Sequence, residues 1–462
     1  MNENNNLTNF LSLAYDELER RNLSLLDEAF TKSSKRLERE RLAKLKKQDN
    51  IKAVSLCFCD IEGRFHILDY DKKFFVKSYD NLTFDGSSVR GFSELAESDL
   101  RIKPDWASLR FLPADVFSVG KVLMFATICT ADRKLYMSDF RGELKEYIEI
   151  LLKKDRVTPY MSTEIEGFLV EGVHAEQRYA DTEEFKLISR GGYFHSLPLD
   201  TLRAFIDKSA EAQRALGFRN EKDHPEVAPS QFELNFSYAH VLQACDQVLL
   251  YKFVCRQIAN SMGMTATFLP KPIANINGSG MHVNFSLAKN GKNLFYKKGG
   301  EGNLSNMAWS IIYKLLNHAP ELTIILNSSV NGFRRLDPNF EAPNQIKVSE
   351  KDRGSMIRIP IGNEKSARLE LRSVGPDANP YLLAYAVLKT AYEGNPLKTP
   401  KNRRTRVRYL PSNIHDALRI FKASGFTDKI LGKQAKNKYA GLKQAAADRS
   451  PKDLGAAVKR SE

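Results

Sequence analysis

The chain has 462 residues and a net charge of +14, with 42% hydrophobic and 27% charged residues. This composition is ordinary for a globular protein and excludes a wholly disordered, collagenous or coiled-coil chain. The longest apolar runs, such as residues 122–126, are far shorter than the roughly 18 residues that a membrane span needs. We therefore expect a folded protein with no membrane contact.

Most of the positive charge lies at the C-terminal end. Residues 398–462 hold 17 basic and 5 acidic side chains. This basic tail lacks interleaved aromatic residues and any recognisable nucleic-acid module, so we expect a solvated or subunit-facing surface and no nucleic-acid binding. The Asn-rich N-terminus carries no signal-peptide pattern, and five scattered cysteines form no disulfide framework, which together indicate the cytoplasm.

The first segment, residues 1–49, is predicted to be a helical N-terminal extension. Over residues 10–47, apolar residues such as Leu11, Ala14 and Leu18 recur at helical spacing, ahead of the charged run KRLERERLAKLKK. These helices could dock against another subunit or remain in solvent.

The sequence pattern of residues 50–131 predicts a small domain dominated by strands. Its strand-like runs are VSLCFCD, GRFHIL, KFFV and VLMFATIC, separated by the turn-forming segments DIEG, DGSS and PDW. A larger mixed domain follows over residues 132–462. Its predicted helices include GELKEYIEILLKK and residues 201–216, 241–262, 306–317 and 380–392, the last with Asn379 as N-cap.

Four short segments of the larger domain alternate polar and apolar residues, which places the polar ones on one face of a sheet. The polar members are Glu164 and Glu166; Gln231, Glu233 and Asn235; His282, Asn284 and Ser286; and Arg368, Glu370 and Arg372, with Glu226 just upstream of the second segment. Any one of these segments alone is more typical of a solvent-facing strand. Together they are dominated by Glu, His and Arg, which bind divalent cations and phosphate.

Five carboxylates and one imidazole in a single cavity would need cations, because the carboxylates repel one another. Oxygen ligands with one His and no thiolate suit Mg²⁺ or Mn²⁺. The six candidate ligands are Glu164, Glu166, Glu226, Glu233, His282 and Glu370. They could supply two sites of three ligands each, with coordination positions left for substrate and water.

Arginine is also concentrated in this region. Six arginines lie within 39 residues, namely Arg334, Arg335, Arg353, Arg358, Arg368 and Arg372. Their planar guanidinium groups suit phosphate and carboxylate. Because no GxxxxGK[ST] or GxGxxG pattern occurs, a nucleotide would be bound by metals and arginines.

Six motifs follow one another in a specific order: FDGSS (Phe84–Ser88), ESD (Glu97–Asp99), GGYF (Gly191–Phe194), KPIANINGSGMHVNFSL, NFEAP and RLELR. In this order the chain resembles the glutamine synthetases, most of all the bacterial and archaeal type I enzymes, over about residues 50–425. The resemblance implies an α+β fold. A small N-terminal β-grasp-like domain would precede a larger catalytic domain whose antiparallel half-barrel sheet is surrounded by helices.

The resemblance also assigns the ligands and the reaction. Glu166, Glu226 and Glu233 would bind the first metal ion, on the glutamate side, and Glu164, His282 and Glu370 the second, on the nucleotide side. The implied reaction uses ATP to convert L-glutamate to γ-glutamyl phosphate, from which ammonia then displaces phosphate.

Further residues match the family's substrate contacts. ATP would be bound by Asn284, Ser286, Arg353, Arg358 and Arg368, and glutamate by Asn277, Gly278, Arg335 and Arg372. Arg353 and Arg358 would also act in phosphoryl transfer. Asp85 and Glu341 match the carboxylates that attract and deprotonate ammonium, with Ser88 and Tyr193 completing that pocket. In the family arrangement Asp85 reaches the site of a neighbouring subunit, so the resemblance implies a homo-oligomer, a dodecamer of two hexameric rings.

Some positions depart from the family pattern. Asn284 stands where many members have a second His. In the strand EIEGFLV, Gly167 has no side chain and so reduces the packing there. The short basic segment NPLKTPKNRRTRVRYLP lacks most of the acidic loop that carries an adenylylated tyrosine, so we expect Tyr409 to be unmodified. Two other functions stay open: a γ-glutamyl ligase with an amine or polyamine acceptor, and a non-catalytic structural relative.

Overall fold

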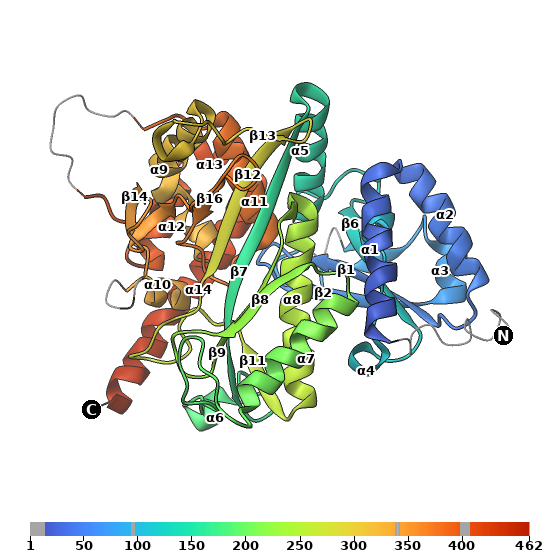
Figure 1. Ribbon diagram of the computed structural model, residues 1–462, viewed down its shortest axis with the longest axis horizontal. Coiled ribbons are helices and arrows are strands. Elements are labelled where there is room, and N and C mark those ends of the chain that lie inside the picture. The colour runs from blue at the N-terminus through green and yellow to red at the C-terminus, as the bar shows by residue number, and fades with distance from the viewer. Residues whose placement is uncertain (1–13, 94–97, 338–339, 341, 398–406, 462) are drawn as a thin grey trace.

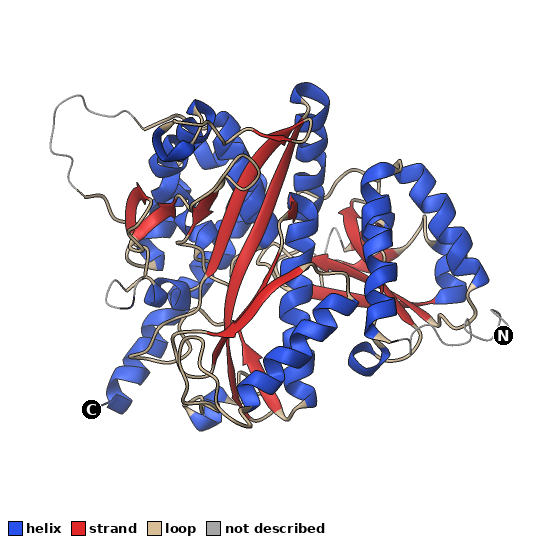
Figure 2. Cartoon of the chain, viewed as in Figure 1, coloured by secondary structure: helices blue, strands red, loops and turns tan. Residues whose placement is uncertain are grey.

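The computed structural model describes residues 14–93, 98–337, 340, 342–397 and 407–461. A smaller body that contains the N-terminal helices lies beside a larger one that contains the longest strands (Figure 1). Both bodies combine helices and strands (Figure 2), so the predicted α+β class is confirmed.

Two helices, α1 (Tyr15–Thr31) and α2 (Ser34–Lys47), precede the first strand. Their apolar stripes pack against the smaller sheet, where Leu18 and Leu37 lie in one buried cluster with Val54. The predicted helical extension therefore covers this sheet in the described part of the chain. The division into segments 1–49, 50–131 and 132–462 stays a prediction.

The smaller sheet has the strand order β2-β1-β6-β4-β3, with β5 paired to β6. Its central pair, β1 and β6, is parallel and the other pairs are antiparallel. The elements are β1 (Ala53–Cys59), β2 (Phe65–Asp71), α3 (Lys72–Ser78), β3 (Thr83–Asp85), β4 (Asp99–Pro104), η4 (Trp106–Ser108), β5 (Arg110–Phe111), α4 (Ala114–Phe117) and β6 (Lys121–Cys129).

The KFFV run, residues 73–76, lies in helix α3, so its prediction as a strand was wrong. The carboxylate of Asp71 accepts hydrogen bonds from the backbone N–H groups of Lys73 (2.8 Å) and Phe74 (3.2 Å) and thereby caps the helix. Phe75 is buried while Phe74 is exposed. Capping and one-sided burial outweigh the β propensity of these residues.

The larger sheet follows the order β14-β15-β16-β12-β7-β9-β8, with β10 and β11 paired to β7 and β13 to β12. Among the described strands of this larger sheet, only β14 and β15 pair in parallel. The curled sheet confirms the predicted half-barrel. Its strands are β7 (Val157–Glu171), β8 (Asn220–Pro225), β9 (Gln231–Phe236), β10 (Ala239–His240), β11 (Met264–Thr267), β12 (Met281–Lys289), β13 (Lys292–Asn293), β14 (Gln345–Ser349), β15 (Ser355–Arg358) and β16 (Leu369–Leu371).

Helices surround this sheet (Figure 1). They are α5 (Phe140–Asp155), α6 (Tyr179–Thr182), α7 (Thr201–Ala215), α8 (Val241–Ser261), η5 (Glu301–Asn303), α9 (Asn306–Leu326), α10 (Val330–Arg335), α11 (Pro380–Glu393), α12 (Ile414–Ala423), α13 (Gly425–Leu431) and α14 (Lys433–Ser461). Among the described helices, none combines the length and apolar character that a bilayer crossing requires.

Helix α9 continues well beyond the predicted end at residue 317, although Pro320 lies inside it. A proline in a helix removes one hydrogen bond and kinks the backbone. The residues that follow, including Leu322, Ile324 and Ile325, are buried. Their burial stabilises the continued helix and offsets the lost hydrogen bond.

A buried ionic cluster joins the two bodies. Arg141 of α5 contacts Asp105, which lies between β4 and η4, at 3.0 Å and forms two 2.9 Å hydrogen bonds to Asp246 of α8. Tyr381 donates a further hydrogen bond to Asp246 at 2.7 Å. Burial opposes ionisation of Asp105, but Arg141 and Lys145 together hold its pKa below the ordinary value.

Replacing Arg141 by Leu should destabilise the protein strongly, by about 3–5 kcal/mol, because two buried carboxylates lose their shared cation. The exposed Arg36, which pairs with Glu40 one helical turn away, is the matched control, and its Leu variant should lose far less stability because water screens this ion pair. Denaturant unfolding at one fixed protein concentration measures both values. Equal losses for the two variants would contradict the role assigned to the buried cluster.

Candidate active site

The four segments with polar faces are neighbouring strands of the larger sheet. In the order β16-β12-β7-β9, Glu370 lies opposite Asn284, His282 opposite Glu164, and Glu166 opposite Glu233. Opposite residues of antiparallel strands lie about 4.5–5.5 Å apart and share one face. The pairing thus gathers the predicted carboxylates and the imidazole on one side of the sheet.

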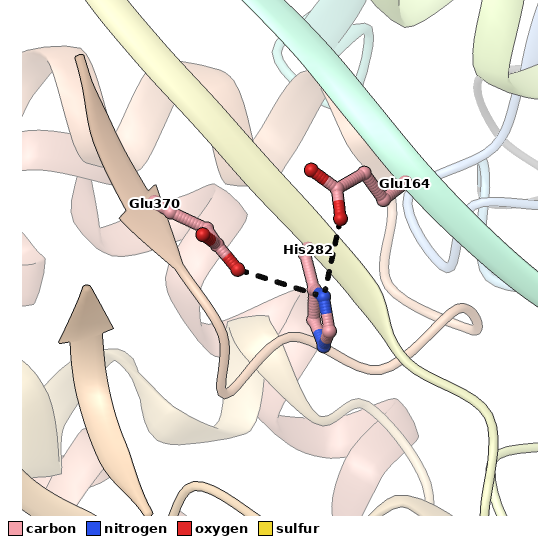
Figure 3. Close-up of side chains that lie close together, drawn as sticks. All are labelled: Glu164, His282 and Glu370. Atoms are coloured by element: carbon pink, nitrogen blue, oxygen red, sulfur yellow. Dashed lines mark ion pairs between the residues drawn. The ribbon is translucent and has the colours of Figure 1, made fainter. Parts of the chain in front are cut away.

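The first cluster consists of Glu164, His282 and Glu370. The Nδ1 atom of His282 lies 3.7 Å from an oxygen of Glu164 and 3.7 Å from an oxygen of Glu370 (Figure 3). One ligand atom from each residue lies within 4.8 Å of the other two. This is the set predicted for the nucleotide-side ion.

A second cluster contains Glu226, Glu233 and His224. His224 lies 3.6 Å from Glu226 through Nδ1 and 3.6 Å from Glu233 through Nε2. Sequence reasoning missed His224, although its position two residues before Glu226 was a usable signal, since alternate residues of a strand share a face. In the described structure His224 joins Glu226 and Glu233 in one group of possible ligand atoms, while Glu166 lies opposite Glu233 in the strand pairing.

Glu166 faces the space between the two clusters. Its Oε2 atom accepts a 2.7 Å hydrogen bond from the backbone N–H of Gly280, and Oε1 lies 4.0 Å from Nε2 of His282. A Cβ atom on Gly280 would lie 2.5 Å from Nη2 of Arg335 and 3.1 Å from Nε2 of His282, so a side chain there would require the Arg335 guanidinium to shift. The loop backbone therefore contributes directly to the packing of the site.

The carboxylates perturb one another's ionisation. Burial, together with the charge of Glu166, raises the pKa of Glu226 to about 7 and that of Glu233 well above its ordinary value. Burial acts the same way on Glu164, but hydrogen bonds and charge from His282 and the Asn284 amide lower its pKa to about 2. Glu226 and Glu233 therefore keep their protons to higher pH than ordinary carboxyl groups when no cation is bound beside them.

This donor chemistry fits divalent cations. Carboxylate oxygens and neutral imidazole nitrogens suit Mg²⁺ or Mn²⁺, and a cation would replace the protons of Glu226 and Glu233. The distances within each cluster are longer than most direct hydrogen bonds, which leaves room for an ion between the ligand atoms.

Two arginines hold Glu370 in the first cluster. Its Oε2 atom accepts a hydrogen bond from Nε of Arg358 at 2.6 Å, and Oε1 accepts one from Nη1 of Arg372 at 2.7 Å. Glu370 is fully buried. Arg335, also buried, donates to the carbonyl oxygens of Val374 (3.0 Å) and Arg372 (3.1 Å), and burial lowers its pKa to about 10.

A cavity of about 400 Å³ opens on the nucleotide side of the clusters. Among its lining residues are the predicted ATP contacts Asn284, Ser286, Arg358 and Arg368. The Asn284 amide donates to Glu164 (2.9 Å) and accepts from Nε of Arg368 (2.9 Å). The residue that departs from the family pattern therefore links a cavity arginine to a candidate metal ligand.

A second cavity, of about 370 Å³, contains most of the remaining predicted residues. It is lined by Glu164, Glu166, Glu226, Glu233, His282, Tyr193, Asn277, Gly278, Arg335, Arg353 and Arg372, among others. Glu164, Lys222 and Arg358 line both cavities. Lys222 was not predicted, because an isolated lysine on a strand carries no specific signal.

Asp85 and Ser88 lie apart from these cavities in the single chain. Both are on the smaller body, where Ser87 and Ser88 donate hydrogen bonds to the Asp85 carboxylate at 2.6 and 2.5 Å. These hydrogen bonds lower the pKa of Asp85. All described residues that line the two cavities come from residues 160–372. Glu341 falls outside the described residues.

Two family models match the chain. The one described as "Glutamine synthetase, beta-Grasp domain" matches residues 50–131, and the one described as "Glutamine synthetase, catalytic domain" matches residues 137–455. The first match confirms the predicted β-grasp fold of the smaller domain.

Individual relatives agree with these matches. Glutamine synthetase of Thermus thermophilus is 35% identical over 434 residues, or 88% of this chain and 94% of the relative. Glutamine synthetase of Staphylococcus aureus (strain Mu50) is 32% identical over 429 residues, or 89% and 94%.

Solved structures are also similar. Plasmodium falciparum glutamine synthetase shares the fold, with a TM-score of 0.79 at 21% identity over 90% of this chain and 96% of that one. GmaS bound to ADP has a TM-score of 0.77 at 26% identity over 89% and 96%.

The raised carboxylate pKa values predict how metal stabilisation depends on pH. Because the folded, metal-free chain holds protons on Glu226 and Glu233 that the unfolded chain has released, its stability should fall as pH rises from about 4.5 through 7. Mn²⁺ should therefore raise Tm more at pH 8 than at pH 6. Thermal unfolding with and without 1 mM-scale Mn²⁺ measures this difference.

The matched control is the double variant Glu226→Gln and Glu233→Gln. Without metal it should unfold at a higher temperature than the wild type at pH 8, because the repulsion is removed, and Mn²⁺ should stabilise it less. A Mn²⁺ effect that is independent of pH in the wild type would contradict the assignment of these two residues as ligands.

Proposed function

Because the chain belongs to the glutamine synthetase family, we propose that it uses ATP to join ammonia to the γ-carboxylate of L-glutamate, giving glutamine, ADP and phosphate. The observation that carries this proposal is the pair of cavities that meet at the carboxylate clusters and share Glu164, Lys222 and Arg358. ATP in one cavity and glutamate in the other would have their reacting groups at this junction.

The first step is attack of the γ-carboxylate oxygen of glutamate on the γ-phosphorus of ATP, which forms γ-glutamyl phosphate and releases ADP. Arg358, which reaches both cavities, would neutralise charge on the transferred phosphoryl group. Arg368 and Ser286 line the nucleotide side. The similarity to GmaS bound to ADP supports a nucleotide in this part of the fold.

Glutamate would be held by the second cavity. Arg335 and Arg372 supply planar donors for its carboxylates, and Asn277 and Gly278 line the same cavity. Arg353, which also lines it, is proposed to act on the phosphoryl group from this side. These positions leave the γ-carboxylate free to face the junction.

Two divalent ions, Mg²⁺ or Mn²⁺, would supply Lewis-acid neutralisation of phosphate charge when bound. Glu164, His282 and Glu370 would hold the nucleotide-side ion. Glu226 and Glu233 would hold the other, with Glu166 as the predicted third ligand and His224 as a further donor within reach. Hydrogen bonds from Arg358 and Arg372 hold the Glu370 carboxylate in position.

In the second step ammonia attacks the acyl carbon of γ-glutamyl phosphate and phosphate leaves. Ammonium must first lose a proton, for which we propose Asp85 and Glu341, with Tyr193 and Ser88 lining the pocket. Since Asp85 lies on the smaller body, away from its own chain's cavities, it would serve the site of an adjacent subunit. This supports a ring assembly of subunits. We propose that the assembly is a dodecamer and that it acts in the cytoplasm.

An amine-accepting γ-glutamyl ligase is the second candidate. The structural similarity extends to GmaS without ligand, with a TM-score of 0.76 at 27% identity over 89% of this chain and 96% of that one, so similarity of fold does not single out ammonia as the acceptor. The metal clusters and the nucleotide cavity would serve either acceptor. A non-catalytic scaffold is disfavoured, because the raised pKa values of Glu226 and Glu233 show that keeping these carboxylates together costs stability.

An acceptor screen tests the proposed reaction. With glutamate, ATP and Mg²⁺, ammonium should give kcat/KM at least about tenfold above methylamine or putrescine, since an anionic pocket selects the small cation. ADP release and mass detection of the product measure this ratio. A preference for an amine would establish the second candidate instead.

The same assay includes two matched variants. Glu370→Ala should lower activity by about 100-fold or more, because it removes a metal ligand and the partner of Arg358 and Arg372. Glu149→Ala, on the exposed face of α5, should leave activity unchanged.

Subunit mixing tests the shared site. Asp85→Ala should impair glutamine formation more than ADP or metal binding, and Glu370→Ala should damage the cavity of its own chain. After subunit exchange, mixed oligomers should regain part of the activity, because some sites combine intact residues from both partners. If differential tagging confirms mixed oligomers that remain as inactive as the separate variants, Asp85 does not act in a neighbouring site.

A further inference from the structure

Helix α1 of the N-terminal extension forms hydrogen bonds to both bodies of the protein. Asn22 on this helix is fully buried. Its amide donates to the carbonyl oxygens of Phe111 (2.9 Å) in the small domain and Ala215 (2.7 Å) at the end of α7, and it accepts a 2.8 Å hydrogen bond from the Phe111 N–H. The bonds to Phe111 hold α1 on the small domain, and the bond to Ala215 holds it against α7 of the larger body.

The last turn of α1 places an aromatic ring against that sheet. Phe30 is 49% exposed, yet its ring stacks on His240 with centroids 3.9 Å apart and planes 16° apart. His240 lies in strand β10, directly opposite Tyr160 of β7. Burial lowers the pKa of His240 to about 4, so the ring is neutral at physiological pH.

The aromatic contacts continue into the nucleotide-side cavity. The centroids of His240 and Tyr160 are 4.8 Å apart, and Tyr160 packs edge-on against Tyr238 at 5.6 Å. Tyr160 and Tyr238 both line the cavity. A row of four rings therefore leads from the N-terminal extension to the wall of the cavity.

A second contact from the same turn reaches the same wall. Asp27 accepts a hydrogen bond from Arg219 at 2.8 Å. Arg219 immediately precedes β8, whose residues Glu221 and Lys222 line the cavity. Thus two neighbouring positions on α1 support two different strands of one wall.

We propose that Phe30 is a positioning residue for the nucleotide, holding His240 and Tyr160 so that the wall formed with Tyr238 is ordered for a purine base. This inference rests on the nucleotide site of the proposed function. Without the Phe30 ring, one face of His240 is released to solvent, and nucleotide binding must then order the His240 and Tyr160 side chains, which lowers affinity.

Replacing Phe30 by Ala tests this role in the full-length protein. The Kd for ADP, measured by calorimetry with Mg²⁺, should rise about two- to tenfold, the range expected for one aromatic pair. The KM for ATP should rise by a similar factor while kcat, Mn²⁺ affinity and Tm change little. Phe30→Trp should restore binding and Phe30→Leu should not, because the stack requires an aromatic face.

Phe74→Ala is the matched control. Phe74 is also a half-exposed aromatic residue on a helix, but it stacks on Tyr70 of the small sheet. It should leave the Kd for ADP unchanged.

An unchanged ADP affinity in Phe30→Ala would overturn the inference while leaving the nucleotide site intact. A lowered Tm with unchanged affinity would reduce Phe30 to a structural role and would also overturn it. If the wild-type protein binds no ADP, the nucleotide site of the proposed function fails, and this inference fails with it.

Discussion

Repulsion between carboxylates on one face of a sheet is the constraint on which the site depends. Strands β16, β12, β7 and β9 bring four glutamates and His282 together in a largely buried place, and His224 of β8 and Glu226 directly after it join them. The repulsion between these carboxylates is offset in two different ways. Around Glu370 two arginines donate hydrogen bonds to the carboxylate, whereas at Glu226 the charge of Lys222 does not offset burial and the repulsion from Glu166, so the pKa of Glu226 rises to about 7 and that of Glu233 rises well above its ordinary value. The second cluster is therefore the one whose charge most requires an added ion.

Much of this arrangement could be predicted from the sequence, because a strand has a period of two. The alternation around Glu164, Glu233, His282 and Glu370 requires each set of polar residues to share a face. Once four such strands occur in one sheet, only their order is unknown. Helices α5, α7, α8 and α11 were equally predictable, since apolar residues at helical spacing must be buried on one side, whereas α14 in the basic C-terminal segment was not predicted. Here local pattern and tertiary packing favour the same structure.

Other features could not be predicted, because they depend on contacts between distant parts of the chain. KFFV was taken for a strand because its composition favours β structure, whereas the Asp71 cap and one-sided burial make it helical. His224 lies outside the four alternating segments, and its position two residues before Glu226 was the one signal that the sequence offered for it. The stacking of Phe30 on His240 joins residues 210 positions apart, and no sequence period relates them. The position of Asp85 relative to a neighbouring cavity depends on an assembly that a single chain does not contain.

The close packing around Gly280 also bears on how this protein can change during evolution. A single methyl group at this position would meet both Arg335 and His282, so one small substitution would disturb the glutamate cavity and a candidate metal cluster together. At most surface positions in a protein of this size, a substitution changes the stability little. Gly280 is different because any side chain added there would displace Arg335, although the glycine itself offers only its backbone N–H to Glu166. The substitutions that this loop tolerates therefore depend on how much room lies between its backbone and the site residues, as well as on which groups take part in the chemistry.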